Sequence, residues 1–159
     1  MENNNRRVVI TGMGIWSCLG TTLDEVKESL FNGKSGIIFS PERKEMGFES
    51  GLTASVKKPE LKGLVDRAHR VFMPEEAQYA YMSTVDALKM AKLDEDYIEK
   101  HDIGLLFGND SSADAVVKSV DTMREKKSTR LVGSGAIFQS MNSTVTMNLG
   151  CLFKLRGIN

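Results

Sequence analysis

Residues 7–15 read RVVITGMGI, and this stretch does most to decide the fold class. A short run of β-branched residues that ends at glycines is typical of a buried strand that runs into a turn. Thr22 and Glu25 follow with the spacing of a capping box, and an apolar helical face leads to a stop at Asn32 and Gly33. The opening therefore predicts a strand, a glycine turn and a helix.

The rest of the chain continues this alternation. Residues 35–63 read as loops with one or two short strands, and a helix with small apolar residues on one face is expected to begin at Pro74. Residues 103–108 have a second buried-strand profile, whereas residues 111–123 and 136–153 have helical spacing. Strands that alternate with helices predict an α/β layer fold with a largely buried sheet.

Composition narrows the function classes. Lys plus Arg number 21 and Asp plus Glu number 21, so the formal net charge is zero and a nucleic-acid binder is not expected. No run approaches the roughly 20 apolar residues that a membrane helix needs, and glycines interrupt the apolar start, so we expect neither a membrane span nor a secretory signal. Cys18 and Cys151 are far apart, which predicts two reduced thiols in a cytoplasmic protein.

The glycines of the opening permit two interpretations. Gly12 and Gly14 lie after a predicted strand and before a predicted helix, as in a dinucleotide-binding motif. However, Ser17 replaces the third glycine of that motif, and no acidic residue is placed to hold a ribose. The alternative, which we favour, is a tight turn in which only small residues fit.

The residues by themselves indicate no catalytic centre. His69 lies in a basic segment that we expect to be a loop, and His101 precedes a predicted strand at a surface position. Neither histidine is patterned as a base for Cys18 or Cys151, and Cys151 is expected to be a small core residue. No metal-ligand spacing is found, so we expect no metal site.

Five segments, in order along the chain, carry a resemblance that goes further. They resemble the β-ketoacyl-acyl carrier protein synthases, and the central loop is most similar to the elongating enzymes of dissociated bacterial fatty-acid synthesis. The first matches the family's opening RRVVITGxGxxS, and the last matches its F-K-I-x-G-x-N. The segments are residues 7–20, 30–37, 66–73, 104–108 and 153–159.

The resemblance implies a thiolase-like fold, with two similar α/β halves in an α/β/α/β/α arrangement and a homodimer. Residues 1–159 would form the N-terminal β-ketoacyl synthase domain, cut before the nucleophilic cysteine. In the family that cysteine follows the segment that ends here at Asn159, and two histidines and a lysine come later still. Neither Cys18 nor Cys151 matches it. Such a half is expected to expose apolar surface where the rest would dock, and to show either self-association through that surface or an incomplete sheet.

The implied reaction is a decarboxylative Claisen condensation of an acyl thioester with malonyl-acyl carrier protein in fatty-acid biosynthesis. The phosphopantetheine arm of the carrier protein holds the substrates, and no further cofactor is expected. This chain alone is expected to be inactive. The alternative is a non-catalytic partner of a polyketide synthase, similar to a chain-length factor, which shares the fold but lacks the cysteine.

The resemblance also implies roles for seven side chains. Three would line the acyl pocket, with two of them on a helix that closes the far end of the pocket in the other protomer. Four would meet the acidic carrier protein. Ordinary packing and ordinary solvated surface are the respective alternatives. The pocket residues are Ser111, Ile137 and Met141, and the docking residues are Arg67, Arg70, Lys127 and Arg130.

Overall fold

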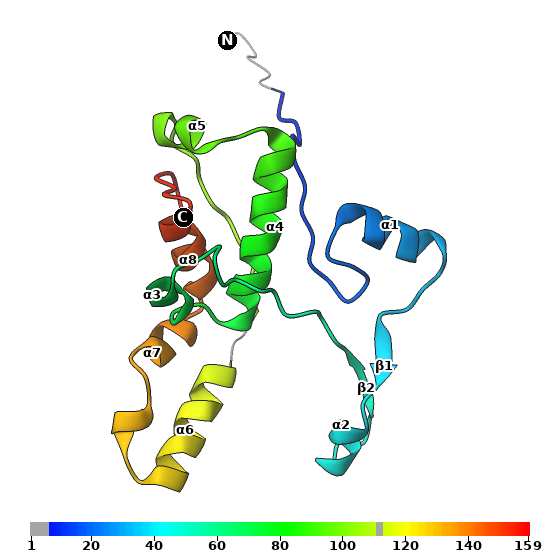
Figure 1. Cartoon of the computed structure of the whole chain (residues 1–159), viewed down its shortest axis with the longest axis vertical. Coiled ribbons are helices and arrows are strands. Elements are labelled where there is room, and N and C mark those ends of the chain that lie inside the picture. Colours follow the sequence, from blue (N-terminus) through cyan, green and yellow to red (C-terminus); the bar gives the residue numbers. More distant parts are fainter. Residues whose placement is uncertain (1–6, 111–112) are drawn as a thin grey trace, which may run out of the picture. The chain divides into compact units, whose positions relative to one another are not determined.

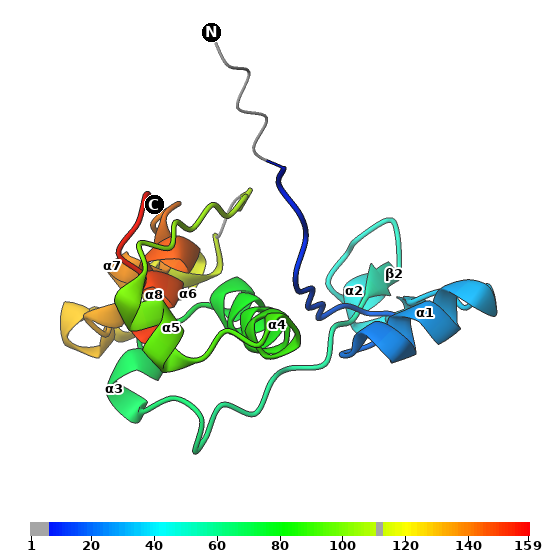
Figure 2. The same cartoon turned by 90° about the horizontal axis from the view of Figure 1, so that it is seen from above.

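The computed structural model describes residues 7–110 and 113–159, which form two compact units (Figures 1 and 2). The first unit comprises Met1–Ser55 and Ser83–Asp94, and the second comprises Val56–Met82 and Glu95–Asn159. The long helix α4 (Glu75–Ala91) contributes its beginning to the second unit and its end to the first. Each unit is described by itself.

The first unit begins with the predicted helix, α1 (Leu23–Phe31). The Thr22 hydroxyl accepts a hydrogen bond from the backbone N–H of Glu25 at 3.2 Å. The Glu25 carboxylate in return accepts the backbone N–H of Thr21 at 2.7 Å, one residue before the cap. The helix ends at Asn32, and Gly33 follows in the left-handed region. The predicted capping box and stop are therefore confirmed.

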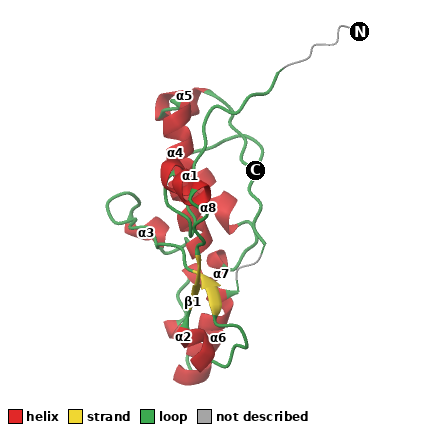
Figure 3. Cartoon of the chain, turned by 90° about the vertical axis from the view of Figure 1, so that its right-hand side faces the viewer, coloured by secondary structure: helices red, strands yellow, loops and turns green. Residues whose placement is uncertain are grey.

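A hairpin of two short strands follows in the same unit. Strands β1 (Ile37–Phe39) and β2 (Leu52–Ala54) pair antiparallel, with Ile38 opposite Thr53. The short helix α2 (Pro41–Glu45) lies between them, capped by the Ser40 side chain. The short strands expected in residues 35–63 are confirmed, and within the described residues they form the one sheet, drawn in yellow in Figure 3.

The two predicted buried strands are not strands in this structure, and that prediction was wrong. Residues 7–15 are assigned to no strand, and Val8 and Ile10 are 96% and 84% exposed. In residues 103–108, Leu106 is 89% exposed. A strand needs neighbours that pair its backbone groups along its length and layers that cover both of its faces. Within the described residues these two segments have only a few such contacts, and their outward side chains stay exposed.

In the second unit, residues 103–105 make two sheet-like backbone hydrogen bonds with residues 157–158. The backbone N–H of Leu105 donates to the carbonyl of Ile158 at 2.7 Å, and the N–H of Gly157 donates to the carbonyl of Ile103 at 3.0 Å. A Cβ on Gly157 would lie 2.5 Å from the backbone of Ile103 and Gly104, so only glycine fits at this approach. The last residues of the chain therefore lie against the second predicted strand.

The second unit is otherwise helical. Its core joins the loop before α3, the start of α4 and helix α8, and Tyr81 stacks on Phe153 with ring centroids 5.3 Å apart. The buried core residues are Leu61, Val65, Met73, Ala77, Ala80, Val145 and Leu149. Besides the start of α4, its elements are α3 (Arg67–Arg70), α5 (Glu95–Lys100), α6 (Asp114–Lys126), the 3-10 helix η1 (Thr129–Leu131), α7 (Gly135–Gln139) and α8 (Thr144–Leu152).

The helix predicted over residues 136–153 is broken into α7 and α8. The break falls at residues 140–143, where the Ser140 hydroxyl donates to the carbonyl of Ile137 at 2.8 Å. Serine and asparagine side chains offer the backbone such local alternatives to helical bonding, which explains the break. Cys151 was predicted to be a small core residue but is exposed in the last turn of α8.

No helix in residues 7–110 and 113–159 is both long and apolar enough to cross a membrane.

Candidate functional site

Helices α6 and α7 border an apolar groove of about 350 Å³. Val116, Val120 and Met123 of α6 line one side, and Ile137 of α7, 66% exposed, lines the other. Met141, predicted with Ile137 to belong to the acyl pocket, follows α7, is 42% exposed and is not among the residues that line the groove. Ser111, the third predicted pocket residue, lies outside the described residues.

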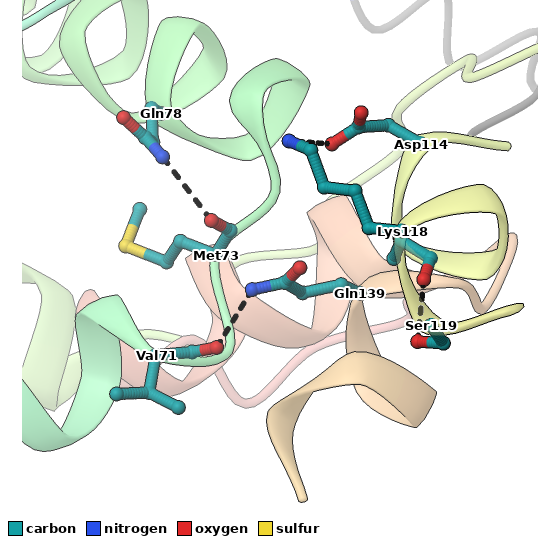
Figure 4. Close-up of polar contacts among 8 residues, drawn as sticks. Val71, Met73, Gln78, Asp114, Lys118, Ser119 and Gln139 are labelled. Atoms are coloured by element: carbon teal, nitrogen blue, oxygen red, sulfur yellow. Dashed lines mark hydrogen bonds and ion pairs between the residues drawn. The ribbon is translucent and has the colours of Figure 1, made fainter. Parts of the chain in front are cut away.

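Several polar side chains of α6 are bonded within the helix, and the side of α6 that lines the groove is mostly apolar. The Ser119 hydroxyl donates to the carbonyl of Ala115 at 2.6 Å, although Ser119 lies in the lining of the groove. The Lys118 ammonium pairs with the Asp114 carboxylate at 2.6 Å, and both side chains are largely exposed (Figure 4). The groove thus suits an apolar ligand, because its lining contains no charged group.

Helix α7 is held in place by the segment between α3 and α4. The side-chain amide of Gln139 donates to the carbonyl of Val71 at 2.8 Å (Figure 4). A Cβ on Gly135 would lie 2.4 Å from the same carbonyl, so α7 can approach this closely only with glycine there. The rings of Phe72 and Phe138 add an edge-to-face contact with centroids 5.1 Å apart. One wall of the groove is therefore fixed to the core.

Helix α8 is fixed to the same segment by a buried amide. The Asn148 side chain is 4% exposed and donates to the carbonyls of Phe72 at 3.1 Å and Thr144 at 2.8 Å. The Phe72 carbonyl lies in the turn between α3 and α4, so the Asn148 amide satisfies a backbone group outside any helix or strand, whereas Thr144 belongs to α8 itself. Asn148 was not predicted as a functional or structural residue, and its polar side chain within an apolar helical face is the one sequence signal of its role.

The four predicted docking cations come from two segments of the second unit. Arg67 and Arg70 lie on α3, which the structure shows to be a helix where a loop was expected, while Lys127 and Arg130 follow α6. Within the described parts of the chain, Arg67, Lys127 and Arg130 are exposed and have no ion-pair partner. By contrast, the neighbouring Arg124 pairs with Asp121 at 3.7 Å.

Helix α3 is positioned by an aspartate cap. The Asp66 carboxylate accepts the backbone N–H of His69 at 3.0 Å and also contacts the His69 ring. The His69 backbone N–H, and then the His69 side chain, hold the pKa of Asp66 below its usual value. This cap orients the first turn that carries Arg67.

The two thiols lie in different surroundings. Cys18 is half-buried beside Gly36, where an added Cβ would lie 2.4 Å from its sulfur. Cys151 lines an apolar recess of about 280 Å³ together with His69 and Phe72. That recess brings a histidine near a cysteine, which the sequence did not indicate. The Nδ1 atom of His69 is nevertheless engaged by Asp66.

The other histidine and the glycines of the opening have structural surroundings. His101 contacts the carbonyl of Tyr97 through Nδ1 at 2.8 Å and stacks on the Tyr97 ring. A Cβ on Gly12 would lie 2.1 Å from the carbonyl oxygen of Ala87, in α4. Because α4 occupies the space that a dinucleotide would need at this glycine, the tight-packing interpretation is favoured over a nucleotide motif.

No group of three or more histidine, cysteine, aspartate or glutamate residues that could hold a metal ion is found in the described stretches 7–110 and 113–159.

The chain is similar to known proteins over nearly its whole length. The family model for "Beta-ketoacyl synthase, N-terminal domain" matches residues 5–159. The 3-oxoacyl-[acyl-carrier-protein] synthase 1 of Haemophilus influenzae is 36% identical over 155 residues, which cover 97% of this chain and 38% of that protein. The chain therefore spans 38% of the length of this curated relative.

Solved structures agree with the sequence comparison. A β-ketoacyl synthase from Burkholderia phymatum superimposes with a TM-score of 0.79 at 28% identity, covering 96% of this chain and 38% of that one. The ishigamide ketosynthase/chain length factor gives a TM-score of 0.77 at 19% identity over 97% of this chain and 38% of its own. The predicted fold class, α/β and thiolase-like, is confirmed.

Proposed function

Because the chain belongs to the β-ketoacyl synthase family and matches its N-terminal domain, we propose that it is the N-terminal part of a 3-oxoacyl-acyl carrier protein synthase of fatty-acid biosynthesis. The observation that carries the proposal is the 36% identity to such a synthase over 155 residues. The longer protein would join an acyl thioester to malonyl-acyl carrier protein. Its nucleophilic cysteine and histidines would come from the part beyond Asn159.

The proposed reaction needs no external cofactor, because every bond that forms is matched by one that breaks within the two thioester substrates and the enzyme thiol. The malonyl thioester loses carbon dioxide, and the electron pair of the broken bond becomes a carbanion at the neighbouring carbon. That carbanion forms a bond to the carbonyl carbon of the acyl-enzyme, and the enzyme thiolate leaves. Nothing is oxidised or reduced by an outside reagent. The substrates would stay on the phosphopantetheine of the carrier protein, in the cytoplasm.

The exposed apolar segments support the idea that this part packs against a remainder. Val8 and Ile10 in the first unit, and Leu106 in the second, are aliphatic side chains outside any helix or strand, and each is largely exposed. Soluble proteins seldom leave such runs bare. We propose that the chain is followed by a C-terminal part that supplies neighbouring strands and covering helices, and that the longer protein is a homodimer.

Within that protein the chain would shape the acyl pocket. We propose that Ile137 and Met141, with Ser111, limit the length of the acyl chain, and that α7 closes the far end of the pocket in the other protomer. The groove beside α6 supports this role, because it is apolar and is lined by Ile137.

We expect Met141→Trp in the full-length protein to shorten the longest acyl chain that it accepts. The indole would fill space that the last carbons of a long chain need. The measurement is the chain-length profile of products by mass spectrometry. Met46→Trp, the same change at a 75% exposed side chain near α2, is the matched control. An unchanged profile in the Met141 variant would remove Met141 from the pocket.

The unpaired cations support docking of an acidic carrier protein. Arg67, Lys127 and Arg130 are exposed, and opposite charge on a partner would speed and orient its approach. We expect Lys127→Glu in the full-length protein to raise KM for carrier-bound substrate several-fold and to leave kcat unchanged. The difference should shrink at high salt. Arg124→Glu is the control, since Arg124 already pairs with Asp121. Equal KM values for both variants and wild type would contradict docking at Lys127.

A chain-length-factor-like partner of a polyketide synthase is the alternative. A neighbour named ketosynthase/chain length factor shares the fold, but at 19% identity the likeness concerns the fold alone. The residue at the position of the nucleophile decides between the two. A cysteine encoded downstream of Asn159 in the family's position supports the synthase, and any other residue supports the alternative.

A further inference from the structure

Another recess of the second unit contains charged groups, unlike the groove beside α6. It has a volume of about 460 Å³ and lies between the loop before α3 and the start of α4. Its lining is formed by Lys58, Pro59, Glu60, Leu61, Arg70 and Gln78. Two cationic side chains therefore share one recess with a single carboxylate.

Arg70 differs from the other three predicted docking cations. Its side chain is half-buried, and its Nε atom is shielded from solvent without a hydrogen-bond partner in the described part of the chain. The backbone of Arg70 is already satisfied, because its N–H donates to the carbonyl of Asp66 at 3.1 Å. A shielded N–H of a charged group without an acceptor is unfavourable, so an acceptor from outside the chain would be stabilised here.

The bonds seen for the other polar side chains of the recess go to backbone groups and not to Arg70. One carboxylate oxygen of Glu60 accepts the backbone N–H of Lys62 at 2.9 Å, so the acid is engaged in its own turn. The Gln78 amide nitrogen donates to the carbonyl of Met73 at 3.2 Å (Figure 4). Neither side chain provides an acceptor for the Nε atom of Arg70 in this structure.

We propose that this recess binds a single oxyanion, a phosphate or a carboxylate, through the guanidinium of Arg70 with the ammonium of Lys58. A guanidinium presents N–H groups in a planar fork that matches two oxygens of such an anion, and Arg70 is part of the lining of the recess. The inference goes beyond the proposed condensation and does not depend on it. It also separates Arg70 from the exposed cations Arg67, Lys127 and Arg130.

The test is a titration of the ¹⁵N-labelled 159-residue chain with inorganic phosphate, and separately with acetate, at constant ionic strength. We expect saturable shifts of the Arg70 Nε–H signal and of the backbone amides of residues 58–61 with at least one of the two anions. Saturation by phosphate alone, by acetate alone or by both supports the site and identifies which oxyanion it takes.

Two variants on α3 make the test specific. Arg70→Lys keeps the charge but removes the fork, and it should weaken the binding by roughly tenfold. Arg67→Lys makes the same change at an exposed position of the same helix and should leave the affinity unaltered. Far-UV circular dichroism checks that each variant folds, and Lys58→Gln, expected to weaken binding several-fold, replaces Arg70→Lys if that variant unfolds. Shifts that do not saturate with either anion, or equal weakening in both arginine variants, would overturn the proposal.

Discussion

At the first turn of α3, one carboxylate determines where the helix begins. Asp66 accepts the backbone N–H of His69 at 3.0 Å, and the Thr22 hydroxyl does the same for Glu25 in α1 at 3.2 Å. The cap at Thr22 was predicted from sequence because its partner Glu25 lies three residues on, ahead of an apolar helical face. The cap at Asp66 was not, because a helix of four residues has too few positions to show a periodic pattern.

The cap at Asp66 should make stability depend on pH in the acid range. Its pKa is lowered in the folded chain, first by the His69 backbone N–H and then by the His69 side chain. A lowered pKa means that the ionised carboxylate stabilises the fold above the unfolded pKa of about 4, and that this contribution is lost as pH falls through the folded pKa. Acid should therefore weaken α3.

Asp66→Asn isolates this effect, because asparagine also caps helices but does not titrate. We expect the melting temperature of the wild type to exceed that of the variant by a constant amount above about pH 5 and to lose this advantage below about pH 4. Thermal unfolding followed by circular dichroism between pH 2 and pH 7 measures the difference. A difference that stays constant over the whole range would show that the Asp66 charge contributes nothing.

At the scale of elements, helices were predicted better than strands. The end of α1 and the beginning of α4 follow from local signals that lie within a few residues of each boundary. The break between α7 and α8 was missed, because Ser140 and its neighbours read equally well as small helical residues. Hydrogen bonds from local side chains to the backbone set the break between the two helices, and the spacing of apolar residues in the sequence does not reveal such bonds.

The approach of the opening segment to α4 gives the sharpest prediction at this scale. A Cβ on Gly12 would lie 2.1 Å from the carbonyl oxygen of Ala87, and a Cβ on Gly14 would lie 1.9 Å from that of Ser83. Backbone atoms cannot turn aside as a side chain can. We expect Gly12→Ala and Gly14→Ala each to lower the free energy of unfolding by about 1–3 kcal/mol, as measured by urea denaturation.

Gly133→Ala is the matched control for this pair. A Cβ at Gly133 would meet no atom within 4 Å, and the residue is not in the left-handed region. Its stability should change by no more than about 0.5 kcal/mol. If all three alanine variants unfold at the same urea concentration as the wild type, the opening segment does not pack on α4 as the structure shows.

At the scale of the whole molecule, the fold class was predicted correctly from the sequence. The predicted burial of two strand segments, however, is not seen in the structure of this chain. Residues 7–15 have the composition of a buried strand, yet Val8 is 96% exposed. Burial depends on partners that other parts of a protein supply, so a sequence can show the need for a partner that its own structure lacks. Members of the family that the chain matches are longer, since it covers 38% of the synthase from Haemophilus influenzae.

The candidate site, too, could be predicted from the sequence only in part. The resemblance indicated Ile137 for the acyl pocket, and the structure places it in an apolar groove, whereas Met141 lies beside that groove's helix but outside its lining. Arg67, Lys127 and Arg130 are exposed cations as docking requires. The half-buried setting of Arg70 was not predictable, because it depends on the distant Lys58 loop and the start of α4.

The most direct measurement is the condensation itself. Purified 159-residue chain and full-length protein would each be supplied with acyl-carrier and malonyl-carrier thioesters, and the 3-oxoacyl product would be followed by mass spectrometry. We expect sustained turnover by the full-length protein. For the 159-residue chain we expect no product above the protein-free control, because under the proposed function the reactive cysteine and its histidines would belong to the rest of the longer protein. Turnover by that chain alone would contradict it.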